Sequence, residues 1–517
     1  MNDATSVLDL VSRGRPAASH RPWPRYVVDE GTWVALGGQL AAGRASLVGL
    51  WGEHGAVHAA LSADGTFFVA SLECPRGAFP SLARVHAPAL RLERAIRDLY
   101  GLEPEGLPDP RPWLVHARGS TYPFLPVEGE SLHQVPVGPV HAGIIEPGHF
   151  RFTVNGETVV RLEARLGYVH KGIESLMAGA DVEHAARLAG RTSGDSTVAY
   201  AIAFARAVEA AVGADVPARA HWLRALMGEL ERLANHVGDI GAVCNDAAFA
   251  LMHAHCAMLR ERVLRAADEC FGHRLMRDQV VPGGVAADLD AAKARVILGL
   301  VDYIAARFPA LIDLYESTAS LQDRTVGAGT LTPSLAEQFA AGGYVGRASG
   351  RDFDARRQPG YPPYDALDFD VPVLREGDVN ARVWIRIREV EQSLKLVRHL
   401  IERMPEGATR TDLAGALAAG AARAPSDPPR APHGTSNDAG PDGGPARREG
   451  VALVEGFRGD VLVWVALDAD GTVARCHLRD PSWFQWPLLE AAIEGNIVAD
   501  FPLCNKSFNC AYSGHDL

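Results

Sequence analysis

Three segments between Gly138 and Tyr200 decide the fold of this chain. They read G-P-V-H-A-G-I-I-E-P-G-H-F-R-F-T-V-N-G-E-T-V-V (138–160), R-L-G-Y-V-H-K-G-I-E (165–174) and R-L-A-G-R-T-S-G-D-S-T-V-A-Y (187–200). Apolar and polar residues alternate from Phe150 to Val160 around Asn155-Gly156, a strong signal for a β-hairpin. The third segment opens a long Ala-rich helix. Because a hairpin and a helix start can both deliver polar side chains to one place, we expect a buried polar site here.

The composition is that of an ordinary globular protein and excludes some classes of function. The chain has 517 residues and is 47% hydrophobic, which suffices for about three domains with a large core. Its formal net charge of −12 argues against nucleic acid as a partner. It contains no apolar run of about 18 residues, so we expect no transmembrane helix. Its seven cysteines form no C-x-x-C pair, which favours reduced, buried thiols in a cytoplasmic protein.

The beginning of the sequence predicts a loose arm followed by a small α/β domain. Residues 1–30 are rich in Pro and Arg and are interpreted as the arm, and the domain is expected over 31–126. Three apolar runs within it have the pattern of β-strands: 47–51, 57–61 and 66–72. A helix follows from Leu92 and is expected to end at Gly101, because glycine readily adopts the left-handed conformation that terminates helices.

A larger and mainly helical domain is expected from 135 to 517, so the fold class is α+β, with a hairpin at the start of this domain. Apolar residues recur at helical spacing from Leu223 to Ile240 and from Ile387 to Ile401, and each set predicts a helix with one buried stripe. Residues 424–448 are rich in Pro, Gly, Asp and Ala and are expected to form a disordered insertion. Alternating patterns near the C-terminus predict two short strands, 461–465 and 472–476.

Charged residues occur at two further places in this domain. The predicted helix at 223–240 carries Glu231, Arg232 and His236, and the sequence leaves open whether they form a solvated face or a functional group. A glycine-rich stretch at 343–350 leads into three charged residues, Asp354, Arg356 and Arg357. Because no G-x-G-x-x-G follows a predicted strand, we do not expect NADH to bind this chain.

The quoted segments resemble one superfamily, the large subunit of membrane-bound group 4 nickel–iron hydrogenases of the formate hydrogenlyase and hydrogenase-4 type. That subunit is related to the D subunit of respiratory complex I. The resemblance rests on Gly138 to His141, Glu146 to Arg151 and Tyr168 to Glu174, with Lys171 where the family has arginine. The run from Leu92 to Asp109 resembles the C subunit of complex I, which hydrogenlyase-type large subunits carry ahead of their D-like part.

The family's metal ligands are missing from this resemblance. Such a subunit holds nickel and iron through four thiolates from two C-x-x-C pairs, because soft sulfur ligands suit these metals. Aligned without gaps, the four ligand positions are Ala189, Thr192, Ala511 and Gly514, and Cys510 lies one residue early. We therefore expect no nickel in this chain, as in hydrogenase-related complexes that lack the metal.

The quinone-binding groups of the complex I relatives are missing as well. The histidine and tyrosine that hold the quinone headgroup there align with Pro147 and Gly190, which carry no donor side chain. A set of ionisable residues remains as a candidate polar cavity: His141, Glu146, His149, Arg151, His170, Lys171, Glu174, Arg187, Arg191, Asp195, Asp354, Arg356 and Arg357. It is interpreted either as a cavity that passes protons or responds to a neighbouring cluster, or as a salt-bridged remnant that keeps the fold closed.

One contact within this set follows from spacing. Arg191 and Asp195 are four residues apart in the segment that replaces the metal motif. On a helix they would stand one turn apart, so we expect an ion pair between them that fills the vacated volume.

The resemblance implies a peripheral-arm subunit of a membrane-bound, ion-translocating oxidoreductase complex. It implies two kinds of partner, a small 4Fe-4S subunit like the B subunit of complex I and antiporter-like membrane subunits, and a position on the cytoplasmic face of the membrane. It implies no cofactor in the chain itself. Two alternatives stay open: an active oxidoreductase subunit that uses quinone or another acceptor in a rearranged pocket, and a structural scaffold without a redox role.

Overall fold

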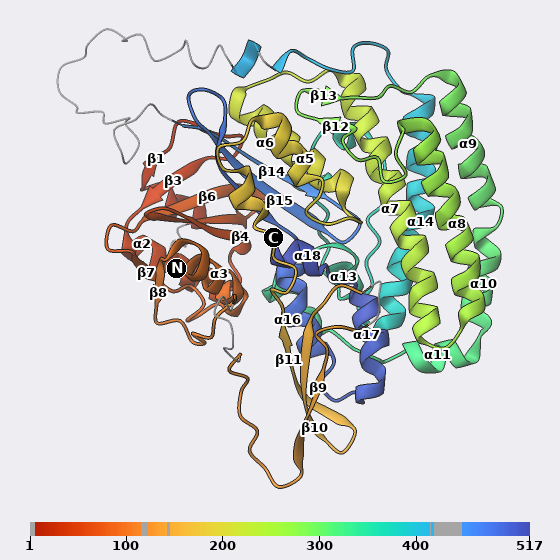
Figure 1. Cartoon of the computed structure of the whole chain (residues 1–517), viewed down its shortest axis with the longest axis horizontal. Helices are drawn as coiled ribbons and strands as arrows, with labels where there is room; N and C mark the ends of the chain where they lie inside the picture. Colours follow the sequence, from red (N-terminus) through yellow and green to blue (C-terminus); the bar gives the residue numbers. More distant parts are fainter. Residues whose placement is uncertain (1–5, 115–121, 142–144, 414, 418–446) are drawn as a thin grey trace.

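A four-stranded sheet lies at the centre of the molecule, between a helical layer and a second sheet (Figure 1). The computed structural model describes residues 6–114, 122–141, 145–413, 415–417 and 447–517. The central sheet has the order β16-β15-β14-β2. Its strands are β2 (His20–Arg21), β14 (Arg448–Glu455), β15 (Asp460–Leu467) and β16 (Val473–Arg479). The two strands expected near the C-terminus are thus confirmed, and each is longer than the pattern indicated.

Both faces of the central sheet are buried, which explains the apolar run from Val451 to Val454 in β14. Successive side chains of a strand point to opposite faces. Ala452 and Val454 belong to the main core, on the side of α6 (Thr197–Val212), whereas Val451 and Leu453 pack against the second sheet. At Gly450 any side chain would collide with the carbonyl group of Ala207, so glycine lets α6 approach the strand closely.

The second sheet belongs to the N-terminal part of the chain and has the order β1-β3-β6-β5-β4. Its strands are β1 (Arg15–Pro16), β3 (Arg25–Val28), β4 (Ser46–Glu53), β5 (Ala56–Ala63) and β6 (Thr66–Glu73). The three strands and the helix expected here are confirmed. The helix is α3 (Leu90–Tyr100), which ends at Gly101 with a positive φ of 67°. Further elements are α1 (Val7–Val11), α2 (Glu30–Ala41), β7 (Ala78–Pro80), η1 (Ala87–Ala89) and β8 (Glu103–Glu105).

The prediction of a loose arm over residues 1–30 is wrong for residues 6–30. β3 pairs in parallel with β6, and β2 pairs in parallel with β14 of the central sheet. The Pro and Arg content suggested a solvated arm, but Trp23 and Val28 are buried in the core. Each of these strands is too short to show a periodicity of its own, so pairing with distant strands decides their structure.

Aromatic side chains join the two sheets face to face. The rings of Trp51 on β4 and Trp464 on β15 lie 5.6 Å apart between centroids, and both side chains are buried. Trp51 also stacks on His477 of β16 at 5.2 Å. Large buried aromatic groups contribute strongly to such contacts. The N-terminal part is therefore packed firmly against the rest of the chain.

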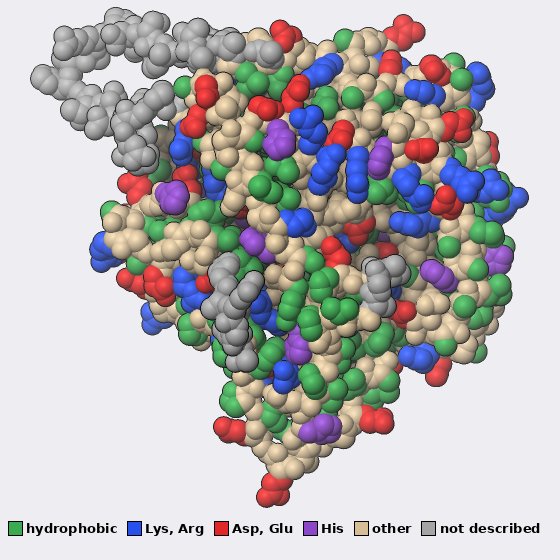
Figure 2. All heavy atoms as spheres, in the orientation of Figure 1, with side chains coloured by type: hydrophobic (Ala, Val, Ile, Leu, Met, Phe, Trp, Pro, Cys, Tyr) green, Lys and Arg blue, Asp and Glu red, His purple; other side chains and the backbone are tan. Residues whose placement is uncertain are grey.

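The expected hairpin projects from the lower end of the molecule (Figure 1). It consists of β10 (His149–Asn155) and β11 (Thr158–Arg165), and β9 (Leu132–Val137) pairs with the other edge of β10. Asn155 pairs with Thr158, and Gly156 in the turn has a φ of 59°, the conformation that the Asn-Gly signal predicts. Figure 2 shows hydrophobic side chains gathered over this lower part of the face.

A helical layer forms the other side of the molecule, and its long members confirm the two predicted helices. These are α7 (Ala218–Asp246) and α14 (Val379–Glu402), which pack on each other and, with α8 (Ala250–Phe271) and α9 (Ala291–Ala305), form the layer at the right of Figure 1. The remaining helices are α4 (Ile173–Met177), α5 (Val182–Ala189), α10 (Phe308–Ser317), α11 (Ala319–Thr325), α12 (Pro333–Gln338), α13 (Gly343–Ala348), α16 (Ser482–Ala492), α17 (Phe501–Phe508) and α18 (Tyr512–Asp516). Short elements complete the fold: β12 (Val280–Val281), β13 (Gly284–Val285), η2 (Arg356–Gly360), η3 (Tyr364–Ala366) and η4 (Val498–Asp500).

Two further sequence predictions concern a disordered insertion and the absence of a transmembrane helix. The disordered insertion expected over 424–448 lies outside the described residues, except that Arg447 and Arg448 are described and β14 begins at Arg448. Among the described residues, no helix combines the length and the apolar character needed to cross a bilayer.

Candidate functional site

The two segments that align with the hydrogenase metal motifs meet next to the C-terminus. The backbone N–H groups of Lys171 and Gly172 donate hydrogen bonds to the carbonyl oxygen of Leu517, at 2.8 and 3.1 Å. His170 donates through Nδ1 to the carbonyl oxygen of Asp516 at 2.6 Å, and the Lys171 ammonium donates to the carbonyl oxygen of Thr192 at 3.3 Å. The quoted segment at 165–174 therefore holds the C-terminal helix α18 beside the segment at 187–200.

A carboxylate fills the space beside Gly514. A Cβ atom added to Gly514 would lie 2.7 Å from Cγ of Asp480, closer than real Cβ contacts allow. Asp480 is fixed there because it accepts hydrogen bonds from the Tyr200 hydroxyl and from the Ser482 backbone N–H, each 2.8 Å long. No side chain, and hence no thiolate, fits at position 514 while Asp480 keeps this position.

The other three positions also fail to supply ligands for nickel. Ala189, Thr192 and Ala511 are buried, and neither an alanine methyl nor a threonine hydroxyl replaces a thiolate. Burial raises the pKa of the Cys510 thiol, which keeps it in the protonated form that binds metals poorly. Among the described residues, no group of three or more His, Cys, Asp or Glu side chains is arranged to hold a metal ion. The residues present do not fit a nickel–iron centre.

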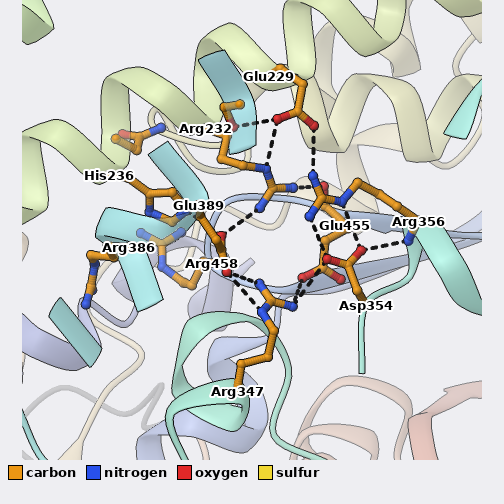
Figure 3. Close-up of polar contacts among 12 residues, drawn as sticks. Glu229, Arg232, His236, Arg347, Asp354, Arg356, Arg386, Glu389, Glu455 and Arg458 are labelled. Atoms are coloured by element: carbon orange, nitrogen blue, oxygen red, sulfur yellow. Dashed lines mark hydrogen bonds and ion pairs between the residues drawn. The ribbon is translucent and has the colours of Figure 1, made fainter. Parts of the chain in front are cut away.

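Among the described residues, a cluster of buried charged side chains lies between α7, α13, α14, the end of β14 and the start of η2 (Figure 3). We call it the buried ion network and define it by the side chains that salt bridges connect. Its members are Glu229, Arg232, His236, Arg347, Asp354, Arg356, Glu389 and Glu455. None of these residues is more than 5% exposed. A set of charges this large is costly to bury and is stable only when its members pair closely.

Arg347 is the hub of the buried ion network. It lies 2.7 Å from Glu389, 2.9 Å from Glu455 and 3.5 Å from Asp354. Arg356 pairs with Asp354 at 2.6 Å and with Glu229 at 2.9 Å, and so links these two carboxylates. The planar guanidinium group offers donors in several directions, which allows one arginine to serve several carboxylates.

The pairing keeps three of the four carboxyls ionised. Burial would raise the pKa of Glu229, Asp354 and Glu389, but the neighbouring guanidinium groups outweigh it and hold these pKa values below the ordinary range. Glu455 behaves differently, since burial and the charge of Asp354 raise its pKa to about 7.

One of the two interpretations of Glu231, Arg232 and His236 is excluded. They do not form a solvated face, because they are 8%, 2% and 0% exposed. The helix α7 that carries them is covered by α6, α8 and α14, so even its polar side faces protein. Arg232 and His236 both bind Glu389, at 3.3 and 2.7 Å.

The candidate residues chosen from the sequence lie in several places rather than around one cavity. Only Asp354 and Arg356 belong to the buried ion network; Arg357 donates instead to the carbonyl oxygen of Phe369. A first group of the remaining candidates lies at the hairpin. His141 contacts the carbonyl oxygen of Gly148 at 2.8 Å, and His149 contacts the carbonyl oxygen of Gly138 at 3.3 Å. Arg151 donates a hydrogen bond of 3.2 Å to Gln134. The second group lies at the C-terminal helix, where Glu146 accepts from the Ser513 N–H and where His170 and Lys171 lie.

Glu174 joins the N-terminal part of the chain to the rest. Its carboxylate contacts Arg475 and His477 of β16, each at 2.9 Å, and accepts a hydrogen bond of 3.1 Å from Tyr100 at the end of α3. Burial would raise the pKa of Glu174, but the charges of Arg475 and His477 outweigh it and lower the value to about 2.

The expected ion pair between Arg191 and Asp195 is wrong. Helix α5 ends at Ala189 and α6 begins at Thr197, so the segment between them is not helical and the two residues do not stand one turn apart. Arg191 is exposed and pairs with Asp278 at 2.7 Å. Asp195 pairs with Arg458 at 2.6 Å. Arg187 is exposed on α5.

Sequence reasoning missed several of the buried charges. Arg347, Glu389, Glu455, Arg458 and Asp480 were not selected as candidate site residues. A usable signal existed for Glu389, because Arg382, Arg386, Glu389 and Ser393 recur at helical spacing in α14. For Glu455 the signal was a carboxylate that directly follows the apolar run from Val451 to Val454.

The comparisons with known proteins define the class of protein. The family profile described as "Respiratory-chain NADH dehydrogenase, 49 Kd subunit" matches residues 246–516, and that of the 30 Kd subunit matches residues 56–126. The profile described as "Nickel-dependent hydrogenase" matches residues 171–238. The chain therefore unites parts that resemble two subunits of complex I and a hydrogenase. It belongs to the family of the 49 kDa subunit of respiratory-chain NADH dehydrogenase.

Named relatives come from both branches of this superfamily. "Formate hydrogenlyase subunit 5" of Escherichia coli is 29% identical over 464 residues, which cover 85% of this chain and 77% of the relative. The D subunit of the NADH-quinone oxidoreductase of Dehalococcoides mccartyi is 31% identical over 374 residues, 70% of this chain and 92% of the relative. A chain of the membrane-bound sulfane sulfur reductase, an archaeal respiratory membrane complex, matches with a TM-score of 0.66 and 25% identity, over 76% of this chain and 100% of that chain. The resemblance to hydrogenase large subunits of the formate hydrogenlyase type is thus confirmed.

Proposed function

We propose that this chain is a peripheral-arm subunit of a membrane-bound, ion-translocating oxidoreductase complex related to formate hydrogenlyase and complex I, and that it holds no nickel–iron centre of its own. The observation that carries the second part is the contact between Asp480 and Gly514, because the carboxylate takes the space that a ligand side chain needs. The names of the relatives, which are subunits of hydrogenases and of NADH-quinone oxidoreductases, support the first part.

The proposed partners are a small 4Fe-4S subunit and antiporter-like membrane subunits, with the complex on the cytoplasmic face of the membrane. An apolar surface supports contact with other subunits near the hairpin. Val140, Ile145 and Tyr168 flank the hairpin strands and are 81%, 41% and 45% exposed. Exposed apolar groups of this size favour burial against another protein.

The two alternatives gain no support from the site. The positions that align with the quinone ligands of complex I are Pro147 and Gly190, and neither can donate a hydrogen bond from a side chain. The buried ion network does not distinguish a redox subunit from a pure scaffold, because close ion pairing can serve the fold in either one. Both alternatives therefore become outcomes of the experiment.

The proposal is tested by purifying the tagged full-length chain from membranes in mild detergent and identifying its partners by mass spectrometry. We expect stoichiometric copurification of a small polypeptide with a 4Fe-4S cluster and of polytopic membrane proteins. Recovery of the chain from the cytosol without partners would overturn the proposal. A complex that contains the partners and oxidises or reduces quinone would favour the acceptor-dependent alternative, and a complex without iron would favour the scaffold.

A further inference from the structure

The buried ion network contains one carboxyl more than it has guanidinium groups. Its acids are Glu229, Asp354, Glu389 and Glu455, and its permanent cations are Arg232, Arg347 and Arg356; the remaining member is the imidazole of His236. Arginine keeps its proton at every accessible pH. With all carboxyls ionised and His236 neutral, the network therefore carries an unmatched negative charge in a region shielded from water.

An unmatched buried charge is costly, and the usual response of a protein is to bind a proton. Burial lowers the pKa of His236 below its ordinary value, which disfavours the imidazolium form. Burial and Asp354 raise the pKa of Glu455, although Arg347 acts in the opposite direction. Glu455 is therefore the member of the network that takes up a proton as the pH falls towards 7.

Another carboxyl, that of Glu231, lines the same small cavity as Glu455. Glu231 accepts hydrogen bonds from the backbone N–H groups of Val198 and Ala199, at 2.7 and 3.1 Å, and it forms no salt bridge within the described part of the chain. Burial, helped by the charge of Asp195, raises the pKa of Glu231 to about 8. Two buried carboxyls in one region of the interior thus have pKa values close to neutral pH.

The cavity has room for a bridging water. Its volume is about 20 Å³, and Glu231 and Glu455 both line it, together with Gly228, Tyr361 and Tyr364. A cavity of that size accommodates about one water molecule where polar partners are present. A second cavity of about 220 Å³ is also lined by Glu231, and Gly194 and the half-buried Asp195 form part of its wall. Glu231 therefore lines two cavities, the small one that it shares with Glu455 and the larger one at Asp195.

We propose that Glu231 and Glu455 form a proton-transfer pair, bridged by water in the small cavity, which connects the buried ion network to the larger cavity at Asp195. One proton leaves the Glu231 carboxyl for the water oxygen while the water gives another proton to the Glu455 carboxylate. The reverse step returns it, and no electron moves. The pair requires only this chain, whereas its use in ion translocation rests on the proposed function.

The surrounding charges set the direction of transfer. Glu455 faces Arg347, Arg232, Asp354 and Asp460. Glu231 faces Asp195 and Arg232. Other titratable or cationic residues line the cavities: Arg206, His221, Arg224, Tyr361 and Tyr364 on the small one, and Arg260 and Arg274 on the larger one. Between about pH 7 and pH 8 the proton therefore rests on Glu231, because its pKa is the higher of the two, and the ionised Glu455 is the acceptor.

Infrared spectroscopy of the purified complex tests the pair, because protonated carboxylic acids absorb at a different wavenumber from ionised carboxylates. Between about pH 6 and pH 9, the wild-type complex should lose carboxylic-acid absorbance as the two groups ionise. Glu231→Gln and Glu455→Gln should each remove part of that change, whereas Glu337→Gln at an exposed position should not. An unaltered change in both variants would overturn the proposal.

A third variant keeps the test independent of the stability of these substitutions. A Cβ atom at Gly228 would meet its nearest neighbours at 3.8 and 3.9 Å, so Gly228→Ala fits the fold while its methyl group occupies the small cavity. It should slow deuterium exchange of the Glu455 carboxyl at least about tenfold without changing the absorbance of Glu231. Gly299→Ala on exposed α9 is the matched control. Unchanged exchange in Gly228→Ala would contradict a water-bridged pair. Loss of ion translocation by a complex that retains the infrared signal would refute only the proposed function.

Discussion

The hydroxyl group of Tyr200 donates a hydrogen bond of 2.8 Å to Oδ2 of Asp480, and this contact fixes the carboxylate over Gly514. Tyr200 lies on α6 and Asp480 follows β16, so the contact also joins the segment at 187–200 to the C-terminal part of the chain. The interior of this protein is closed by hydrogen bonds at the place where its hydrogenase relatives are expected to hold metal.

The steric conflict at Gly514 gives the first prediction. Gly514→Ala should lower the free energy of unfolding by about 1–3 kcal/mol, because the new methyl group overlaps Asp480. In an Asp480→Ala background the same substitution should cost less than about 1 kcal/mol. The reason is that the free-energy effects of substitutions at two contacting residues do not add. Urea unfolding of the four proteins measures the coupling. Equal costs in both backgrounds would show that Asp480 does not occupy that space.

The second prediction concerns the hub of the buried ion network. Arg347→Met leaves Glu389, Glu455 and Asp354 without their shared cation and should destabilise the chain by about 3–5 kcal/mol. Arg398→Met is the matched control, because Arg398 forms an exposed pair with Asp302 and should contribute less than about 1 kcal/mol. Thermal unfolding compares the two. Similar losses in both variants would mean that the network does not stabilise the fold.

The third prediction uses the pH dependence of Glu174. Its pKa in the folded protein is about 2, below the ordinary value of 4.5. The stabilisation from its ionised form is therefore complete above about pH 5 and is lost as the pH falls from there towards 2. Glu174→Gln should cost about 3 kcal/mol at pH 7 and progressively less below pH 5.

Thermal unfolding of wild type and variant between pH 3 and pH 7 measures this difference. The two curves should approach each other as the pH falls. A difference that stays constant over this range would show that the charge of Glu174 is unimportant, and a variant as stable as the wild type at pH 7 would contradict the contacts with Arg475 and His477.

Local patterns predicted the regular elements well. The hairpin at Asn155-Gly156, the strands of both sheets and the long helices α7 and α14 follow from alternation or helical periodicity over many residues. The pairing of residues 6–30 was not predictable in this way. β2 has only two residues, and its place beside β14 depends on a contact with a strand more than 400 positions away.

The site was predictable in part. The absence of thiolates at Ala189 and Gly514 is a property of the sequence, but the filling of the space by Asp480 is a property of packing. Asp354 and Arg356 were found because charges cluster in the sequence after a glycine-rich stretch. Glu389 and Glu455 were missed because their partners lie on other elements, and spacing along one element does not reveal such pairs.

The central claim is that this chain is a nickel-free subunit beside an iron–sulfur partner, and elemental analysis of the complex purified in mild detergent tests it most directly. We predict no nickel above background and about four or more iron atoms per copy of this chain, as one 4Fe-4S cluster requires. A nickel content near one atom per chain would contradict the account, because it would require a metal site where the structure has Asp480 against Gly514.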